Sequence, residues 1–377
     1  MRVEIVRTLQ ALAAIEADWV GLTSHSRYFS PFQTFDWVYA CCQWVEKADD
    51  LFIIAVRDGT RLIGLAPLVL CTEQFGAKSL RFIGMGISDY LTCLAEAGQE
   101  EIVLDSIMHT LLDCRQLWDS VILRDLPGSM SNLDALSTQA VAVGFHLSFP
   151  SGPSTCWELS LPSSWEEYLA NLSSELRSSM ERKARKLRRE FAVRVEDMAL
   201  SPAWKGGLQT LFDLHQERWT SKGRPGAFAE GRIQQLHRQV VAAFRTRGWV
   251  SLPVIFANDQ PIAAIYLFRM WGTVYYYLSG CRTDAPWNRY SVGLQVLREA
   301  IKHAIETGAT TFDFMRGAMT YKERLGAKPV ENVNIVLFHS RTRYLAYKAM
   351  TIGRQVLKTK APQPLKRVAK KLFSQGM

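Results

Sequence analysis

The chain has 377 residues, of which 48% are hydrophobic and 21% are charged. This length and composition suit two globular domains, and they exclude a disordered, low-complexity or collagen-like protein. Most of the net charge of +9 lies in residues 341–377, which hold ten lysines or arginines and no acidic residue. A basic segment of this kind favours contact with an anionic surface.

The sequence favours a cytoplasmic protein without a metal. Glu4, Arg7, Glu16 and Asp18 interrupt the apolar stretch that a secretory signal would need. No window of 18 residues is apolar enough to cross a bilayer. The seven cysteines contain no Cys-x-x-Cys pair, and the seven histidines have no ligand spacing, so we expect reduced thiols and no zinc site.

The first half, residues 1–155, is predicted to form an α/β domain. Apolar residues three or four positions apart predict helices at 9–24, 35–45, 99–115 and 131–143. Runs of β-branched and aromatic residues predict strands at 2–7, 51–56, 61–70, 78–84, 120–126, 145–149 and 156–161. The dipeptide Asp58-Gly59 between two of these runs predicts a hairpin.

The second half, residues 156–340, repeats the plan with longer helices. Helices are predicted at 163–190 (one or two), 202–219, 231–247 and 291–306. Strands are predicted at 192–198, 250–256, 261–268, 274–280, 310–315 and 333–339, the second to fourth forming an antiparallel meander. Residues 341–377 are predicted to be a basic helical tail, broken by Pro362 and Pro364.

Seven motifs occur in order along the chain. They are FSPFQTFDWVYA (29–40), GMGISDY (84–90), SVILRDLP (120–127), LSSELRSSMERKARKL (172–187), LHQERW with GRPGAF (214–228), NRYSVGLQVL (288–297) and DFMRGAMTYK (313–322). This ordered set resembles the BioF-type or CelD-type acetyltransferase domain of the GNAT superfamily, and the resemblance spans about residues 1–340. It implies two tandem GNAT-like domains, each a mixed, mostly antiparallel sheet flanked by helices, an architecture similar to that of the FemABX transferases.

The resemblance implies an acyltransferase of exopolysaccharide or cell-envelope metabolism. The expected donor is acetyl-CoA or another acyl-CoA, and the expected acceptor is a small molecule or glycan precursor. The last motif departs from the family pattern, because Ala318 and Met319 stand where an acidic residue is usual. The departure removes a carboxylate that would assist acceptor binding or proton removal.

The donor site is expected at a loop that leads into a helix. Free N–H groups at a helix N-terminus bind phosphate, and the resemblance assigns the pyrophosphate of coenzyme A to Arg289, Ser291, Val292, Gly293 and Leu294. Gly293 would allow close approach of the backbone, Ser291 would cap the helix and Arg289 would add a charge. An ordinary capped helix start is the alternative.

Two residues are candidates for proton transfer. Asp313 lies in the middle of a predicted strand, where a carboxylate is costly unless it is paired or lines a cleft, so it is a candidate base. Tyr321 is assigned to protonation of the leaving thiolate by the resemblance. The alternatives are a structural ion pair for Asp313 and a packing role for Tyr321.

The remaining candidates are assigned to substrate binding. His215, Arg218 and Trp219 share one face of a predicted helix, and the other candidates are Asp89, Tyr90, Arg316 and Lys322. We expect Asp89, His215, Arg218 and Asp313 to converge on one cavity between the two domains. A core histidine with satisfied nitrogens and a turn stabilised by Asp89 are the alternatives. Two alternatives to an acyl-CoA enzyme stay open: a transferase that uses charged tRNA, and a silent scaffold. The tail is expected to draw the protein weakly to the inner face of the membrane, and a tail helix packed on the second domain with its charges in water is the alternative. No specific nucleic acid is expected.

Overall fold

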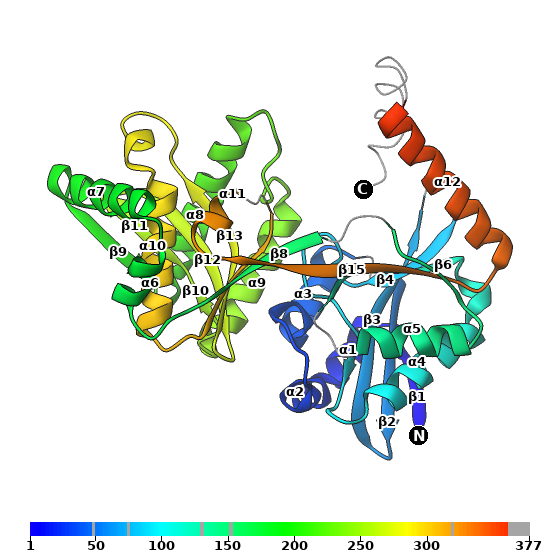
Figure 1. Ribbon diagram of the computed structural model, residues 1–377. Helices are drawn as coiled ribbons and strands as arrows, with labels where there is room; N and C mark the ends of the chain where they lie inside the picture. Colours follow the sequence, from blue (N-terminus) through cyan, green and yellow to red (C-terminus); the bar gives the residue numbers. More distant parts are fainter. Residues whose placement is uncertain (47–49, 74–75, 129–131, 151–153, 318–319, 361–377) are drawn as a thin grey trace. The chain divides into compact units, whose positions relative to one another are not determined.

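The computed structural model describes residues 1–377 apart from 47–49, 74–75, 129–131, 151–153, 318–319 and 361–377. The chain divides into two compact units (Figure 1). The first comprises residues 1–154 and 331–377, and the second comprises residues 155–330. The sequence departure at Ala318 and Met319 therefore lies outside the described residues.

The first unit is built on a mixed sheet. Its strands are β1 (Arg2–Val6), β2 (Leu51–Asp58), β3 (Arg61–Thr72), β4 (Lys78–Phe82), β5 (Leu94–Ala95), β6 (Ser120–Pro127), β7 (His146–Ser148) and β15 (Lys328–Phe338). The order is β1-β2-β3-β4-β6-β15, with β5 beside β3 and β7 beside β15. All these pairs are antiparallel except β4 with β6.

Helices flank this sheet. They are α1 (Leu9–Ala14), α2 (Glu16–His25), α3 (Phe35–Trp44), α4 (Glu100–Asp113), α5 (Asn132–Ala142) and α12 (Arg341–Lys360). The predicted hairpin is present, since Asp58 pairs with Arg61 across Gly59, whose φ is +59°. Gly64 of β3 lets α4 pack closely, because a Cβ there would lie 2.2 Å from Cγ1 of Val103.

Strand β15 completes the first sheet from a distant part of the sequence. It pairs with β6 from Asn332 to Leu337 and with β7 from Val336 to Phe338. The predicted boundary had placed residues 331–340 in the second domain. Periodicity in the sequence locates a strand but does not identify the strands it pairs with. The sequence therefore could not show that β15 belongs to the sheet of the first unit.

The second unit is also built on a mixed sheet. Its strands are β8 (Ser154–Ser160), β9 (Val193–Asp197), β10 (Val250–Ser251), β11 (Pro253–Ala257), β12 (Gln260–Met270), β13 (Thr273–Cys281) and β14 (Thr311–Arg316). The order is β8-β14-β13-β12-β11-β9, with β10 beside β12. Only β13 and β14 are parallel among these pairs. The predicted meander is β11-β12-β13.

Helices cover both faces of the second sheet. They are α6 (Trp165–Asn171), α7 (Ser174–Glu190), α8 (Trp204–Thr220), α9 (Gly231–Thr246), α10 (Val292–Glu306) and α11 (Thr320–Arg324). Ile265 of β12 is buried in one core with residues of α6, α7 and α10. The next residue, Tyr266, faces the other way and lies 5.6 Å from the ring of His237 on α9. Because successive side chains of β12 point to opposite faces of the sheet, α10 covers one face and α9 covers the other.

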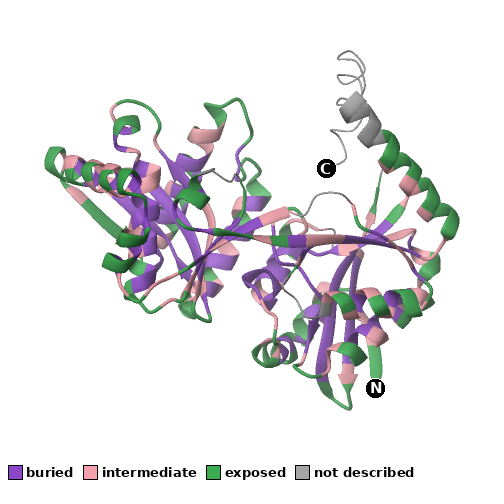
Figure 2. Cartoon of the chain, in the orientation of Figure 1, coloured by how far each residue is buried: buried purple, intermediate pink, exposed green. Residues whose placement is uncertain are grey.

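The burial pattern confirms the predicted fold class of sheets flanked by helices. Figure 2 shows buried residues concentrated along the strands and on the helix surfaces that face them. All seven cysteines are free. No helix in the described ranges has both the length and the apolar character needed to cross a membrane. Within the same ranges, no group of three histidine, cysteine or acidic residues could hold a metal ion.

Candidate functional site

The parallel strands β13 and β14 separate partway along their length. They pair from Thr273 with Thr311 to Tyr275 with Asp313. Beyond that point β13 continues to Cys281, and the chain then passes through a 3-10 turn (Trp287–Tyr290) into α10. Because α10 connects two strands that diverge, its N-terminus lies near the opening between them.

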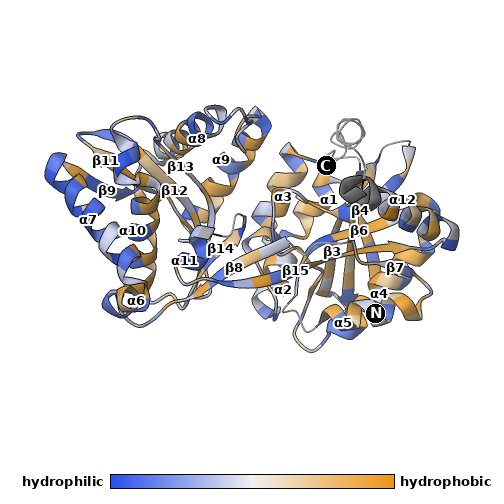
Figure 3. Cartoon of the chain, turned by 45° about the horizontal axis from the view of Figure 1, so that its top comes forward, coloured by the Kyte–Doolittle hydropathy of each residue, from blue (hydrophilic) through white to orange (hydrophobic). Residues whose placement is uncertain are grey.

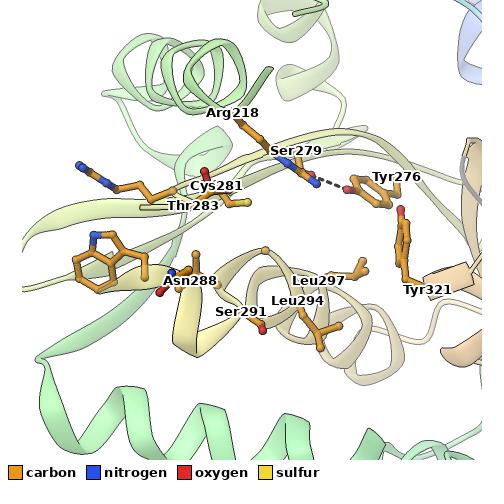
Figure 4. A pocket seen from close by; sticks show the side chains of 14 residues that line it. Arg218, Tyr276, Ser279, Cys281, Thr283, Asn288, Ser291, Leu294, Leu297 and Tyr321 are labelled. Atoms are coloured by element: carbon orange, nitrogen blue, oxygen red, sulfur yellow. Dashed lines mark hydrogen bonds between the residues drawn. The ribbon is translucent and has the colours of Figure 1, made fainter. Parts of the chain in front are cut away.

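A cavity of about 440 Å³ occupies this region (Figure 4). Its lining comes from β13, α10, α8, α11 and the connecting turn, and consists of Arg218, Tyr276, Ser279, Cys281, Arg282, Thr283, Trp287, Asn288, Ser291, Val292, Gly293, Leu294, Leu297 and Tyr321. No aspartate, glutamate or histidine is among the described residues that line it. The cavity is therefore cationic and has apolar walls.

Two adjacent residues of β13 show that the cavity reaches both faces of the sheet. A Cβ on Gly280 would lie 2.4 Å from the backbone nitrogen of His215, so this position faces α8. Cys281 faces α10, because its Sγ would lie 3.0 Å from a Cβ on Gly293. Since the cavity is lined both by Arg218 of α8 and by the start of α10, it passes through the opening between β13 and β14.

The start of α10 has an unusual local geometry. Ser291 is in the left-handed region with a φ of 51°, and its carbonyl accepts hydrogen bonds from Leu294 and Gln295. The predicted cap is absent, because the Ser291 side chain accepts no hydrogen bond from the N–H groups of α10. Instead Ser291 Oγ accepts a hydrogen bond of 2.8 Å from Nζ of Lys183 on α7. The first N–H groups of α10 and an ammonium group therefore lie close together.

Three hydroxyl groups meet at another part of the cavity. Tyr276 Oη and Ser279 Oγ are 2.6 Å apart, and a further hydrogen bond joins Tyr276 to Tyr321. Burial raises the pKa of both tyrosines, and Tyr276 raises that of Tyr321 further, although Arg218 acts in the opposite direction. Both phenols are therefore protonated at neutral pH. Tyr321 remains 41% exposed, so a ligand can reach it.

Six predicted residues line this cavity. They are Arg218, Ser291, Val292, Gly293, Leu294 and Tyr321. Arg289, predicted beside them, does not line it and pairs with Glu190 at 3.2 Å. Trp219 lies one residue beyond Arg218 and is also outside the lining, with Nζ of Lys222 at 5.6 Å from its ring.

His215 is a buried structural residue with both ring nitrogens engaged. Nδ1 lies 2.8 Å from the carbonyl oxygen of Ser279, and Nε2 accepts a 3.2 Å hydrogen bond from the N–H of Ala227. This arrangement requires the neutral imidazole with its proton on Nδ1. Burial lowers the pKa of His215, which favours the same form. His215 thus ties the loop after α8 to β13 and does not line the cavity.

The predicted residues on β14 and α11 also lie outside the lining. Asp313 is buried and its Oδ1 accepts a 2.6 Å hydrogen bond from the N–H of Met315. Phe312 and Phe314 belong to the core beneath α10, so strand alternation turns Asp313 to the opposite face. Arg316 is exposed.

Lys322 was predicted as a substrate contact but is 2% exposed. Its Nζ donates hydrogen bonds to the carbonyl oxygens of Phe314 at 3.0 Å and Met315 at 2.8 Å. The ammonium group therefore holds the end of β14 in place. The sequence did not predict that Lys322 is buried and bonded to carbonyl groups, because it follows Tyr321 in a short polar segment that looks exposed.

Asp89 and Tyr90 belong to the first unit and are not among the residues that line the cavity. Both are buried, and Tyr90 has a φ of 56°. The carbonyl of Tyr90 accepts a 3.3 Å hydrogen bond from Ser30, and Ser88 accepts one of 2.9 Å from the indole of Trp37. These contacts hold the GMGISDY loop inside the first unit.

Several lining residues were missed by sequence reasoning. Tyr276, Ser279 and Cys281 lie on β13. Lys183, which contacts the lining residue Ser291 without lining the cavity, lies within a helix whose charges the sequence assigned mainly to solvent. Figure 3 shows that most of α7 is hydrophilic, so one lysine with a specific contact does not stand out in its sequence. The alternation of β13 gives the direction of its side chains, but the point where β14 leaves it carries no sequence signal.

The comparisons with known proteins agree with this geometry. Residues 174–323 match the model of the acetyltransferase (GNAT) domain family. This segment contains most of the second sheet and all the residues that line the cavity. A search of curated proteins found no match.

Several solved structures share the fold over most of the chain. FemX has a TM-score of 0.62 at 12% identity, covering 93% of this chain and 100% of its own. The C-terminal domain (DUF2156) of a putative lysylphosphatidylglycerol synthetase from Agrobacterium fabrum has a TM-score of 0.53 at 12% identity, covering 93% and 98%. L-PGS from Bacillus licheniformis has a TM-score of 0.51 at 10% identity, covering 90% and 96%.

At these identities the structural likeness establishes the fold and leaves the substrate open. The catalytic class follows from the sequence match, because residues 174–323 correspond to an acetyltransferase domain. Residues 174–323 of the second unit therefore match a GNAT acetyltransferase domain, and this match supports an acyltransferase.

Proposed function

We propose that the protein transfers an acyl group from an acyl-CoA to an amine. The main support for this proposal is the cavity between the separating strands β13 and β14, which the start of α10 helps to line. Backbone N–H groups at the start of a long helix favour an anionic ligand, and Lys183 adds a positive charge beside them. The pyrophosphate of coenzyme A fits such a site, and Gly293 leaves room for it.

The residues of the cavity support a direct transfer. The donor supplies an acyl thioester, whose carbon forms a bond to the amine nitrogen while its bond to sulfur breaks. Tyr321 gives its proton to the departing sulfur, a role that its protonated phenol allows. Tyr276 and Ser279 hold the Tyr321 hydroxyl in a hydrogen-bonded chain. The proton of the attacking amine leaves to water, and a proton from water returns to the Tyr321 phenolate to restore the phenol.

We assign the acceptor to cell-envelope or exopolysaccharide metabolism. The seven ordered motifs support this assignment, since they resemble the BioF-type and CelD-type group. The acceptor would then be a small amine or a glycan precursor. Calorimetric titration with acetyl-CoA tests the donor first. A protein that does not bind acetyl-CoA would contradict the proposal and leave the transferase that uses charged tRNA and the silent scaffold.

A charged tRNA is the second candidate donor. The observation in its favour is α7, which carries exposed basic residues next to the lysine that contacts Ser291. Polyanions bind such surfaces through several phosphates, with a steep dependence on salt. Binding of aminoacyl-tRNA together with failure to bind acetyl-CoA would select this donor. The cavity of about 440 Å³ favours acyl-CoA.

The pH dependence of the reaction should follow the acceptor. Burial raises the pKa of Tyr276, Tyr321 and Cys281, so these groups keep their protons at neutral pH. The cationic cavity also disfavours a bound ammonium group. We expect kcat/KM to rise with pH up to the pKa of the acceptor amine. Two amines of different basicity should give inflections at different pH values, and a shared inflection would indicate a base on the enzyme.

The C-terminal helix supports a weak membrane attachment. Tyr344 and Tyr347 of α12 pack against Phe338, whereas Leu345 and Ile352 are 54% and 60% exposed. Residues 341–377 contain ten basic residues and no acid. Apolar side chains beside positive charges bind anionic lipid surfaces. We assign this face to the inner surface of the membrane.

Sedimentation with vesicles tests the attachment. The wild type should be recovered with phosphatidylglycerol vesicles and much less with phosphatidylcholine vesicles, because the lysines and arginines add about 1 kcal/mol each near an anionic surface. The double variant Leu345→Glu and Ile352→Glu should lose this recovery. Val141→Glu, at a residue that is 60% exposed on α5, is the matched control. Equal recovery with both lipids, or binding that survives deletion of 341–377, would contradict the attachment.

A further inference from the structure

Among the described residues, the guanidinium of Arg218 has no ion-pair or hydrogen-bond partner in the cavity. Arg218 lines the cavity from α8, and its guanidinium forms no ion pair or hydrogen bond with the residues that the structure describes. Arg282, by contrast, also lines the cavity but is paired through two hydrogen bonds with Asp284. Arginine presents a planar fork of donors that suits carboxylate and phosphate groups. Arg218 is therefore the group available to an anionic ligand.

The position of Arg218 separates it from the proposed phosphate site. Gly280 faces α8 and Cys281 faces α10, so the two helices lie on opposite faces of β13. Figure 4 shows Arg218 and Ser291 on opposite sides of the strand, with the Arg218 guanidinium beside Ser279. A donor held at the start of α10 would enter from one face. Arg218 projects from the other face, where the second substrate would approach.

The charges of the cavity lining also favour an acceptor with an anionic group. With Arg218 and Arg282 present and no acidic or histidine residue among the described lining, an ammonium group has no counter-charge there. An acceptor bound through its amine alone would be repelled until it lost a proton. An anionic group on the same molecule would offset this repulsion and hold the neutral amine near the thioester.

From these observations we infer that the acceptor carries a carboxylate or phosphate group, which Arg218 binds. This inference rests on the proposed acyl-CoA reaction and names its acceptor class: amino acids and amino-sugar phosphates rather than neutral or polycationic amines. Arg218 selects the acceptor, and the tyrosine chain serves the donor. The two functions lie on different elements, so they can be separated by substitution.

The test uses pairs of acceptors that differ by one charge. Initial rates of coenzyme A release from acetyl-CoA are measured with amino acids against their amides and with glucosamine 6-phosphate against glucosamine. For each enzyme, kcat/KM for the charged acceptor is divided by kcat/KM for its neutral partner. This ratio is then compared between wild type and Arg218→Gln, so the differing basicity of the two amines cancels. The carboxylate and phosphate arms identify which anion is bound.

Loss of a charged hydrogen-bond pair lowers binding by about tenfold to a hundredfold. Arg218→Gln should lower the ratio by that factor, and Arg218→Lys should restore part of it. Lys205→Gln, which removes an exposed charge from the same helix, should leave the ratio unchanged. Unchanged affinity for acetyl-CoA and an unchanged melting temperature would show that Arg218→Gln is folded and keeps its donor site.

Other outcomes would overturn the inference in distinct ways. An equal loss for both members of each pair, or weaker acetyl-CoA binding in Arg218→Gln, would assign Arg218 to the donor. Turnover of neutral amines alone, or of no member of the panel, by a wild type that binds acetyl-CoA would contradict the acceptor class. If wild type does not bind acetyl-CoA, the proposed function itself fails.

Discussion

Replacing Gly293 by glutamate is expected to lower the affinity for acetyl-CoA by about a hundredfold or more. Any side chain at this position meets Cys281, because a Cβ would lie 3.0 Å from its Sγ. The added carboxylate would also lie at the start of α10, where it would compete with the pyrophosphate for the same N–H groups. Isothermal titration calorimetry with acetyl-CoA measures the effect.

The control for this substitution is another glycine at the start of a helix in the same unit. Gly231 begins α9, and a Cβ there meets nothing within 4 Å. Gly231→Glu should bind acetyl-CoA like the wild type. The steric part can be isolated with Gly293→Ala, whose contact Cys281→Ala would relieve. Unchanged affinity in Gly293→Glu would exclude the start of α10 as the donor site.

Tyr321→Phe is expected to lower kcat by about a hundredfold to ten-thousandfold, the range of general acid catalysis. The substitution removes the proton that we assign to the departing sulfur and keeps the ring that packs near Phe314. Since the pKa of Tyr321 is raised, the wild-type phenol stays protonated across the neutral range. KM for acetyl-CoA should change little, because the pyrophosphate contacts are on α10. Steady-state kinetics separates the two parameters.

Two further tyrosines make this result specific. Tyr276→Phe keeps the Tyr321 hydroxyl but removes its hydrogen-bonded neighbour, so we expect a smaller loss of kcat. Tyr347→Phe changes a tyrosine of the first unit that packs against Phe338, and it should have no effect. A larger loss in Tyr276→Phe than in Tyr321→Phe would assign the proton donor to Tyr276.

Much of the candidate site could be predicted because its parts have local signals. Residues 288–297 combine a turn with helical apolar spacing, and α10 follows as expected. Tyr321 was found through the order of motifs. The meander β11-β12-β13 was evident from β-rich runs and the turn at Asn258-Asp259. These features depend on neighbours in sequence, which the sequence displays directly.

The rest depended on contacts between distant residues. His215 was expected on a substrate wall, yet Ser279 and Ala227 occupy both of its nitrogens. Asp313 was expected near the reacting atoms, yet it does not line the cavity and its Oδ1 accepts a hydrogen bond from the N–H of Met315. A polar residue in an apolar segment has the same sequence signature whether its partner is a ligand or the backbone.

The origin of strand β15 bears on how the chain is made. The sheet of the first unit acquires residues 331–338 only after the whole second unit has left the ribosome, since β15 pairs with β6 and β7. Until then the edge of β6 has unpaired backbone groups, a surface on which unfinished chains aggregate. The second unit is contiguous and can fold during synthesis. The first unit reaches its final form last, although its N-terminal strand is made first.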